Sequence, residues 1–279
     1  MAWYGWDSCA VVDFYSSRGL QYGDGLFETV ALIDGEPLFW ESHLLRLRQG
    51  AALLGIQLEE EAQIQKQWES FRRCIPKQAA RRLVLKILVE REQGQGYGTP
   101  AQSPARLLWL VQEWPKRDPD YWNIGITAGL STVPLQTGAP YLTVKSLNRL
   151  NQIMARRALP ATWQEAVLLD LQGFLREGIQ SNLLWRQGAV VYTPDLEDGG
   201  ISGIQRDAIC RQLPQWGFTV KFVRIRPAIL RDAHEILFCN SLIGAWPVAN
   251  WQGRVLPGAQ GPLAQSLAAW HEQLGLGPQ

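Results

Sequence analysis

The chain contains 279 residues, of which 46% are hydrophobic and 19% charged, and its formal net charge is +1. This composition is typical of a folded protein with one large domain or two ordinary ones, and a charge near zero offers no electrostatic footprint for nucleic acid. No run of about 18 apolar residues predicts a membrane-spanning helix, and no basic region followed by an apolar one predicts a secretory signal, so a cytoplasmic protein is expected.

The first half of the chain predicts a sheet covered by two helices. Residues 26–33 (LFETVALI) have the length and β-branched content of a strand. Within 40–56, Leu44, Leu47 and Ala51 recur at the spacing of one helical face. The other elements expected in this half are a helix at 59–74 and strands at 81–90 and 105–114, joined by a glycine-rich loop. These elements predict an N-terminal α+β domain over residues 1–113.

Residues 114–122 interrupt this pattern, because they contain Pro115, Pro119 and several charges without periodicity, and they predict an interdomain linker. A C-terminal domain is then expected over residues 123–279. Its predicted strands are 123–130, 141–144, 165–178 with a turn, 181–194 with a turn, 218–225, 235–241 and 244–250, and its helices are one beginning at Lys145, one within 200–213 and one at 262–274. Strands and helices do not alternate regularly, so the predicted fold class is α+β rather than doubly wound.

The cysteines and histidines are scattered along the chain. Cys9, Cys74, Cys210 and Cys239 form no CxxC pair, which favours a reduced state in the cytoplasm and argues against structural zinc. The three histidines form no HxxxH or HExxH pattern, so no metal site is predicted.

Glycines precede a helical pattern in GGISGIQRDAI (199–209). Free backbone N–H groups at a helix start can hold a phosphate, although a plain turn into a helix has the same pattern. The GDG and GQG sequences at 23–25 and 94–96 complete no nucleotide-binding motif, and structural turns are the better interpretation of both.

Lys145 stands in VKSLNRLNQ, directly after the predicted strand 141–144. Unlike arginine, a lysine can lose its proton when it is desolvated and can then act as a nucleophile. A solvated surface lysine at a helix start is the alternative interpretation, and the residue taken alone does not decide between them.

Four segments, taken together and in order, resemble the fold-type IV pyridoxal-phosphate enzymes: YGDGLFETV, HLLRL, VKSLNRLNQ and FLREGIQSNLLW…TPDLEDGGISGIQR. That family includes branched-chain aminotransferases, D-amino acid aminotransferases and 4-amino-4-deoxychorismate lyases. The resemblance covers nearly the whole chain. It implies an N-terminal α/β sandwich, a C-terminal pseudo-barrel with helices, pyridoxal 5'-phosphate as the cofactor, and a homodimer.

The resemblance also implies roles for particular residues. Lys145 matches the lysine that forms the Schiff base with the cofactor, and Glu177 matches the carboxylate that pairs with the pyridine nitrogen. Arg46 matches an arginine that contacts the cofactor phosphate. The remaining residues implied to bind the cofactor come from the helix start and from FCNSL, and they are Gly203, Ile204, Gln205, Asn240 and Ser241.

Three features make the chain most similar to the lyases: Arg149 four residues after Lys145, the segment CNSLIGAWPV, and Tyr97 in GQGYG. This similarity implies conversion of 4-amino-4-deoxychorismate to 4-aminobenzoate and pyruvate, a step of folate biosynthesis, with Lys145 as proton shuttle and Thr29 as an aid to the leaving group. The substrate-binding residues it implies are Phe27, Arg91, Tyr97 and Arg149. The loop after Arg91 is one residue shorter than the lyase pattern and lacks its second arginine.

Two other functions stay open at this point. An aminotransferase acting on branched-chain or D-amino acids would need a 2-oxo acid as amino acceptor, which a lyase does not need. A non-catalytic protein that only binds the cofactor has no turnover to lose, so replacing Lys145 would remove only the absorbance of the imine.

Overall fold

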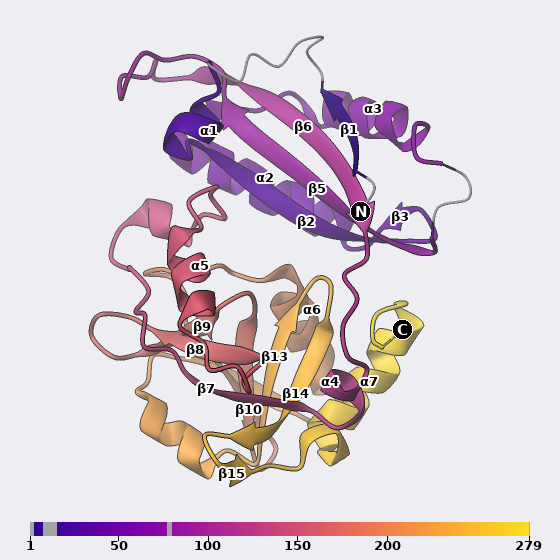
Figure 1. The fold of residues 1–279 in the computed structure, drawn as a ribbon, viewed down its shortest axis with the longest axis vertical. Coiled ribbons are helices and arrows are strands. Elements are labelled where there is room, and N and C mark those ends of the chain that lie inside the picture. Colours follow the sequence, from indigo (N-terminus) through magenta and orange to yellow (C-terminus); the bar gives the residue numbers. More distant parts are fainter. Residues whose placement is uncertain (1–2, 8–15, 77–79, 279) are drawn as a thin grey trace. The chain divides into compact units, whose positions relative to one another are not determined.

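The structure is a computed structural model that describes residues 3–7, 16–76 and 80–278. The chain forms two compact units, of which the first comprises Met1–Pro115 with Val144–Asn148 and the second comprises Lys116–Thr143 with Arg149–Gln279 (Figure 1). The division falls after Pro115, within the predicted linker 114–122. The short segment around Lys145 therefore packs with the first unit although it lies far along the chain.

The first unit contains a six-stranded sheet in the order β1-β6-β5-β2-β3, with β4 beside β6. Its elements are β1 (Trp3–Asp7), α1 (Arg18–Tyr22), β2 (Gly25–Ile33), β3 (Glu36–Pro37), α2 (Trp40–Leu54), β4 (Ile56–Gln57), α3 (Glu61–Arg72), β5 (Arg82–Arg91) and β6 (Ser103–Glu113). The predicted strands and helices of this half are confirmed, with bounds that differ by a few residues at most.

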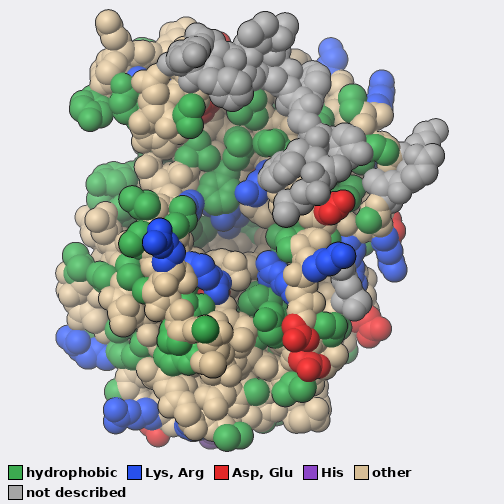
Figure 2. Space-filling view, viewed as in Figure 1, with side chains coloured by type: hydrophobic (Ala, Val, Ile, Leu, Met, Phe, Trp, Pro, Cys, Tyr) green, Lys and Arg blue, Asp and Glu red, His purple; other side chains and the backbone are tan. Residues whose placement is uncertain are grey.

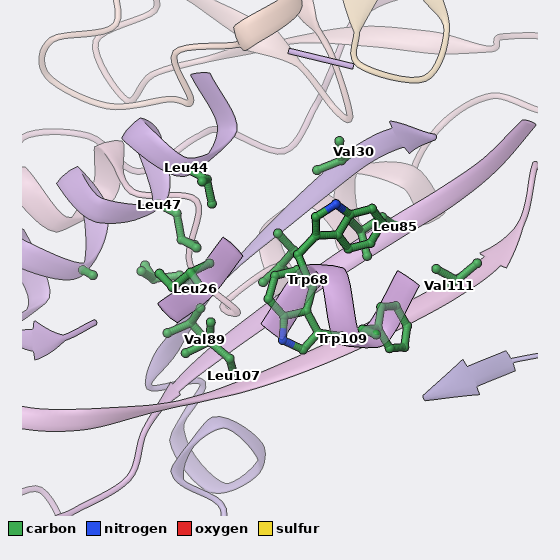
Figure 3. Packing of buried hydrophobic residues seen from close by; sticks show 14 of the residues in the cluster. Leu26, Val30, Leu44, Leu47, Trp68, Leu85, Val89, Leu107, Trp109 and Val111 are labelled. Carbon is green, nitrogen blue, oxygen red and sulfur yellow. The ribbon is translucent and has the colours of Figure 1, made fainter. Parts of the chain in front are cut away.

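The core of the first unit lies between the sheet and the helices α2 and α3. Strand side chains alternate between two faces, so Leu26 and Val30 of β2 belong to the same core cluster. Figure 3 shows Leu26 beside Leu44 and Leu47 of α2. Four aromatic rings fill the centre of this core, with centroids of neighbouring rings between 5.7 and 6.3 Å apart: Trp40, Trp68, Phe71 and Trp109. The opposite face of β2 carries Phe27 and Thr29 and stays outside this core.

The second unit contains a nine-stranded mixed sheet in the order β12-β11-β10-β13-β14-β7-β8-β9, with β15 beside β14. Its elements are α4 (Asp120–Asn123), β7 (Ile126–Leu130), η1 (Pro140–Thr143), α5 (Leu150–Arg157), β8 (Glu165–Leu169), β9 (Leu175–Gly178), β10 (Asn182–Gln187), β11 (Val190–Pro194), α6 (Ile204–Gln212), η2 (Leu213–Trp216), β12 (Thr219–Val223), η3 (Pro227–Asp232), β13 (Glu235–Asn240), β14 (Gly244–Trp251), β15 (Arg254–Val255), η4 (Gly258–Gln260) and α7 (Pro262–Gln273). The sheet curls until β9 lies against β10 and β11, which gives the predicted barrel-like form. Helices α6 and α7 pack on β13.

Two predictions around Lys145 are wrong. Residues 141–143 belong to the 3₁₀ helix η1 rather than to a strand, Val144 follows it in a bend, and the next α-helix begins at Leu150 rather than at Lys145. The reason is tertiary: the Phe27 N–H donates to the Lys145 carbonyl at 3.0 Å and the Leu147 N–H donates to the Gly25 carbonyl at 2.9 Å. Because β2 uses these backbone groups, the segment stays extended.

Charged side chains are dispersed over the surface. On the face drawn in Figure 2, basic and acidic side chains stand singly or in small groups among hydrophobic and other residues, in keeping with a net charge of +1. Among the described residues, no helix is both long and apolar enough to cross a membrane.

Candidate active site

Lys145 is fixed on the outer face of the first unit's sheet. Its backbone pairs with the start of β2, and its Nζ lies 4.2 Å from the centroid of the Phe27 ring. The side chain is half-buried. An ammonium group over an aromatic face is attracted by the ring, so the amine is held at one place rather than extended into solvent. The predicted pair Lys145 and Phe27 is thus brought together.

Thr29 and a second lysine share this face. Phe27 and Thr29 are two residues apart on β2, so their side chains leave the same side of the sheet. Thr29 is paired directly with Lys86 of β5, whose side chain therefore points the same way. Lys86 was not among the site residues predicted from the sequence. The alternation within residues 81–90 places it on the face opposite the core, and this pattern could have indicated that it lies beside Thr29.

Glu28 points to the other side of β2, where it forms a buried ion-pair cluster with two residues of α2. Its Oε2 lies 2.7 Å from His43 Nδ1 and 2.6 Å from Arg46 Nη2, and its Oε1 accepts a hydrogen bond from Arg46 Nε at 2.8 Å. Burial raises the pKa of Glu28, but the charge of Arg46 and the hydrogen bonds from His43 and Arg46 outweigh it and lower the pKa to about 2. Burial lowers the pKa of His43, so this ring is neutral and its Nδ1 donates to the carboxylate.

Arg46 is therefore already oriented before any ligand binds. Its guanidinium has five N–H groups, and Glu28 takes those at Nε and at one position of Nη2. The predicted phosphate contact stays a prediction, and it must be made by the remaining N–H groups.

Arg91 is held by hydrogen bonds within the first unit. Its side chain is buried, and all three nitrogens donate within the first unit: Nε to Asp24 at 3.0 Å, Nη1 to the Gly55 carbonyl at 2.9 Å, and Nη2 to the Leu54 carbonyl. The predicted substrate contact stays a prediction. These partners lie 36 or more positions away in the chain, so no local pattern could indicate them.

Tyr97 lies on a surface turn of the first unit. Gln95 and Gly98 exchange two backbone hydrogen bonds, which confirms a structural turn for the GQG sequence. The Tyr97 side chain is 93% exposed, and its ring packs against Tyr22 with centroids 5.6 Å apart. Its predicted role in substrate binding stays a prediction.

Glu177 lies at the end of β9 in the second unit. Its side chain is buried, and its Oε2 accepts the Ile201 N–H at 2.7 Å. Arg149, the residue before α5, interacts electrostatically with Glu177. Burial lowers the pKa of Arg149, and attraction to Glu177 offsets part of this shift. A buried carboxylate can pair with a protonated ring nitrogen, which is the role that the resemblance implies for Glu177.

The start of α6 offers backbone donors. No side chain caps this helix, and Gly203 precedes it in an extended conformation. The N–H groups of the first turn, which include those of Ile204 and Gln205, have no acceptor within the helix. A Cβ at position 203 would lie 1.7 Å from Oδ1 of Asn182, so only glycine allows this approach. The geometry fits the predicted phosphate-binding helix start.

Two predicted cofactor ligands use their side chains elsewhere. The Gln205 amide is buried against His271, with their Nε2 atoms 2.7 Å apart, so only its backbone N–H can face a phosphate. The Asn240 Oδ1 accepts the N–H groups of Leu242 and Ile243 at 2.9 and 3.0 Å, and its Nδ2 donates to the Gln180 carbonyl. Asn240 therefore shapes the turn that carries Ser241, and its predicted contact with the cofactor stays a prediction.

These groups suit pyridoxal 5'-phosphate. Taken by itself, the first unit carries an amine held on an aromatic ring; the second unit, taken by itself, carries a buried carboxylate and a helix start without a side-chain cap. An aldehyde, a pyridine nitrogen and a phosphate dianion require these three kinds of partner.

Comparisons with known proteins give one consistent result. The family model of class IV aminotransferases matches residues 25–251. The aminodeoxychorismate lyase of Vibrio harveyi is 26% identical over 84% of this chain and 85% of its own, and a putative branched-chain-amino-acid aminotransferase of Methanocaldococcus jannaschii is 28% identical over 87% and 84%. The solved structure of 4-amino-4-deoxychorismate lyase from Pseudomonas aeruginosa superposes with a TM-score of 0.87 at 30% identity, covering 97% of this chain and 98% of the other.

Proposed function

Because the chain belongs to the class IV aminotransferase family, as the resemblance predicted, we propose that it is a pyridoxal-phosphate-dependent aminodeoxychorismate lyase. It would convert 4-amino-4-deoxychorismate to 4-aminobenzoate and pyruvate in folate biosynthesis. The observation that carries this choice is the sheet face on which Lys145, Thr29 and Lys86 lie together. A catalytic amine, a hydroxyl and a second cation suit a substrate that carries two carboxylates and an oxygen leaving group.

In this proposal Lys145 holds the cofactor covalently, Glu177 pairs with the pyridine nitrogen, and the phosphate is met by the Ile204 and Gln205 N–H groups, Arg46 and Ser241. The bound cofactor supplies an electron sink for the carbon that bears the substrate's amine. Arg149 binds the substrate in this proposal, as the resemblance implies.

The remaining chemistry is proton transfer by residues of this chain. Once the substrate's amine has replaced it on the cofactor, the Lys145 Nζ amine would be free to take the proton from the amine-bearing carbon. The bond from the adjacent ring carbon to the enolpyruvate oxygen then breaks, with the Thr29 hydroxyl assisting the departing oxygen, and the ring becomes aromatic. Lys145 returns the proton to the methylene carbon of enolpyruvate, which yields pyruvate. Lys86 binds a substrate carboxylate.

The test is pyruvate release from 4-amino-4-deoxychorismate without any added 2-oxo acid. Lys145→Ala should abolish both this release and the visible absorption of the lysine-bound cofactor, whereas Lys221→Ala, at an exposed lysine of β12, should change neither. Absence of pyruvate, together with amino transfer that needs 2-oxoglutarate, would identify the runner-up, an aminotransferase acting on branched-chain or D-amino acids. A relative named as a putative branched-chain-amino-acid aminotransferase is 28% identical to this chain and supports the second candidate.

We also propose a homodimer in the cytoplasm. Support comes from the resemblance and from the cysteines, since the described ones, Cys74, Cys210 and Cys239, are free thiols. Light scattering that gives the mass of one chain would refute the dimer.

A further inference from the structure

The backbone of Ile201, in the second unit, is held on both sides. The N–H of Ile201 donates to Glu177 Oε2 at 2.7 Å, and the carbonyl of Ile201 accepts from Asn182 Nδ2 at 2.8 Å. Glu177 and Asn182 are both buried, at 5% and 6% exposure. Because neither side chain can turn to water for a substitute partner, the two bonds fix the orientation of the two peptide groups that flank the Ile201 Cα.

The two side chains are themselves held at a constant separation. Glu177 is near the end of β9 and Asn182 begins β10, and the turn between them is closed by a 2.7 Å bond from the Gly178 N–H to the Ser181 carbonyl. Glu165, fully buried on β8, accepts from the Ile179 N–H at 3.0 Å and from Ser181 Oγ at 2.9 Å. These hydrogen bonds therefore hold the turn, and with it Asn182, in a fixed position relative to Glu177.

Ile201 leads directly into the start of α6. Gly203 follows two residues later, and Asn182 Oδ1 occupies the space that a side chain at this position would need. Ile201 is preceded by Gly199 and Gly200, whose φ angles of +151° and +95° are ones that other residues rarely adopt. Without its two side-chain bonds, a segment with such glycines would have much freedom, so the bonds determine where the helix start lies.

We propose that Asn182 is a positioning residue that couples the Glu177 carboxylate to the start of α6, so that binding of the cofactor's ring nitrogen and of its phosphate are interdependent. This inference rests on the proposed cofactor, and it does not depend on which reaction the protein catalyses. Loss of one of the two buried bonds should weaken phosphate recognition by about tenfold, the usual effect of removing one buried hydrogen-bonding group.

The experiment compares two probes, pyridoxal 5'-phosphate and pyridoxal, bound to the cofactor-free full-length protein. The ratio of the dissociation constant of pyridoxal to that of pyridoxal 5'-phosphate measures what the phosphate contributes to binding. Asn182→Leu should lower this ratio about tenfold. Glu177→Leu should weaken both probes and also lower the ratio, although this residue is assigned to the ring nitrogen. Thr193→Val is the matched control, because it removes a different buried bond, from Thr193 Oγ1 to the Leu183 carbonyl at 2.8 Å, and should leave the ratio unchanged.

The outcomes separate the possible explanations. An unchanged ratio in Asn182→Leu, with a melting temperature lowered as in Thr193→Val, would reduce Asn182 to a structural role and overturn the proposal. An unchanged ratio in Glu177→Leu would also overturn it, since no coupling would exist. If Asn182→Leu does not fold, Gly203→Ala displaces the same amide from the opposite side and must lower the ratio. Failure to release pyruvate refutes the lyase alone, whereas a wild-type protein that binds neither probe overturns both ideas.

Discussion

Glu28→Gln should destabilise the first unit by about 3 kcal/mol at neutral pH. The pKa of Glu28 falls from 4.5 to about 2 in the folded protein, and each unit of difference corresponds to about 1.4 kcal/mol. The residue is 1% exposed, so solvent screening removes little of this contribution. Glutamine also places an NH₂ group where an oxygen accepts from His43 or Arg46, and at least one buried donor then loses its acceptor.

The sign of the pH dependence follows from the lowered pKa. The unfolded carboxyl takes up a proton before the folded one, so the contribution is complete above about pH 4.5 and is lost as the pH falls toward about 2. Urea denaturation followed by tryptophan fluorescence, at pH 7 and pH 3, measures the free energy of unfolding of wild type and variant. The difference should shrink by about 2 kcal/mol between these pH values.

The control is Glu36→Gln, because Glu36 pairs with Arg72 at the surface and should contribute less than about 1 kcal/mol. A Glu28→Gln variant that loses no more than this control at pH 7, or whose deficit is the same at pH 3, would refute the reasoning.

Three further predictions concern other parts of the molecule. Trp109→Ala should lower the free energy of unfolding by about 3–5 kcal/mol in urea titrations, because it leaves a cavity among three other rings. Arg91→Lys should lower the melting temperature while leaving KM for the substrate unchanged, and a raised KM at unchanged stability would support its predicted substrate contact. Burial lowers the pKa of His271 to about 3, so the stability of the second unit should fall by about 1.4 kcal/mol per pH unit from about pH 6.5 downward, and His271→Asn should lack this slope in urea titrations at several pH values.

Secondary structure could be predicted wherever it depends on residues that are close together in the sequence. The β-branched run of β2 and the helical spacing of Leu44, Leu47 and Ala51 each arise from contiguous residues, and both elements formed as predicted. The same holds for the glycine-led start of α6. Lys145 and Glu177 were found because their sequence contexts resemble those of known enzymes, although the resemblance carried no information about their neighbours.

Only the tertiary structure decided which polar group each side chain meets. Lys145 lies in an extended segment because β2, more than a hundred residues earlier in the chain, pairs with its backbone. Arg91, Asn240 and Gln205 were predicted as ligands from the resemblance, which carried no information about the intrachain hydrogen bonds that their side chains make. Periodicity reports which face a residue occupies. A hydrogen-bond partner is set by distant segments that folding brings together, since a buried polar group must be satisfied by whatever lies within reach.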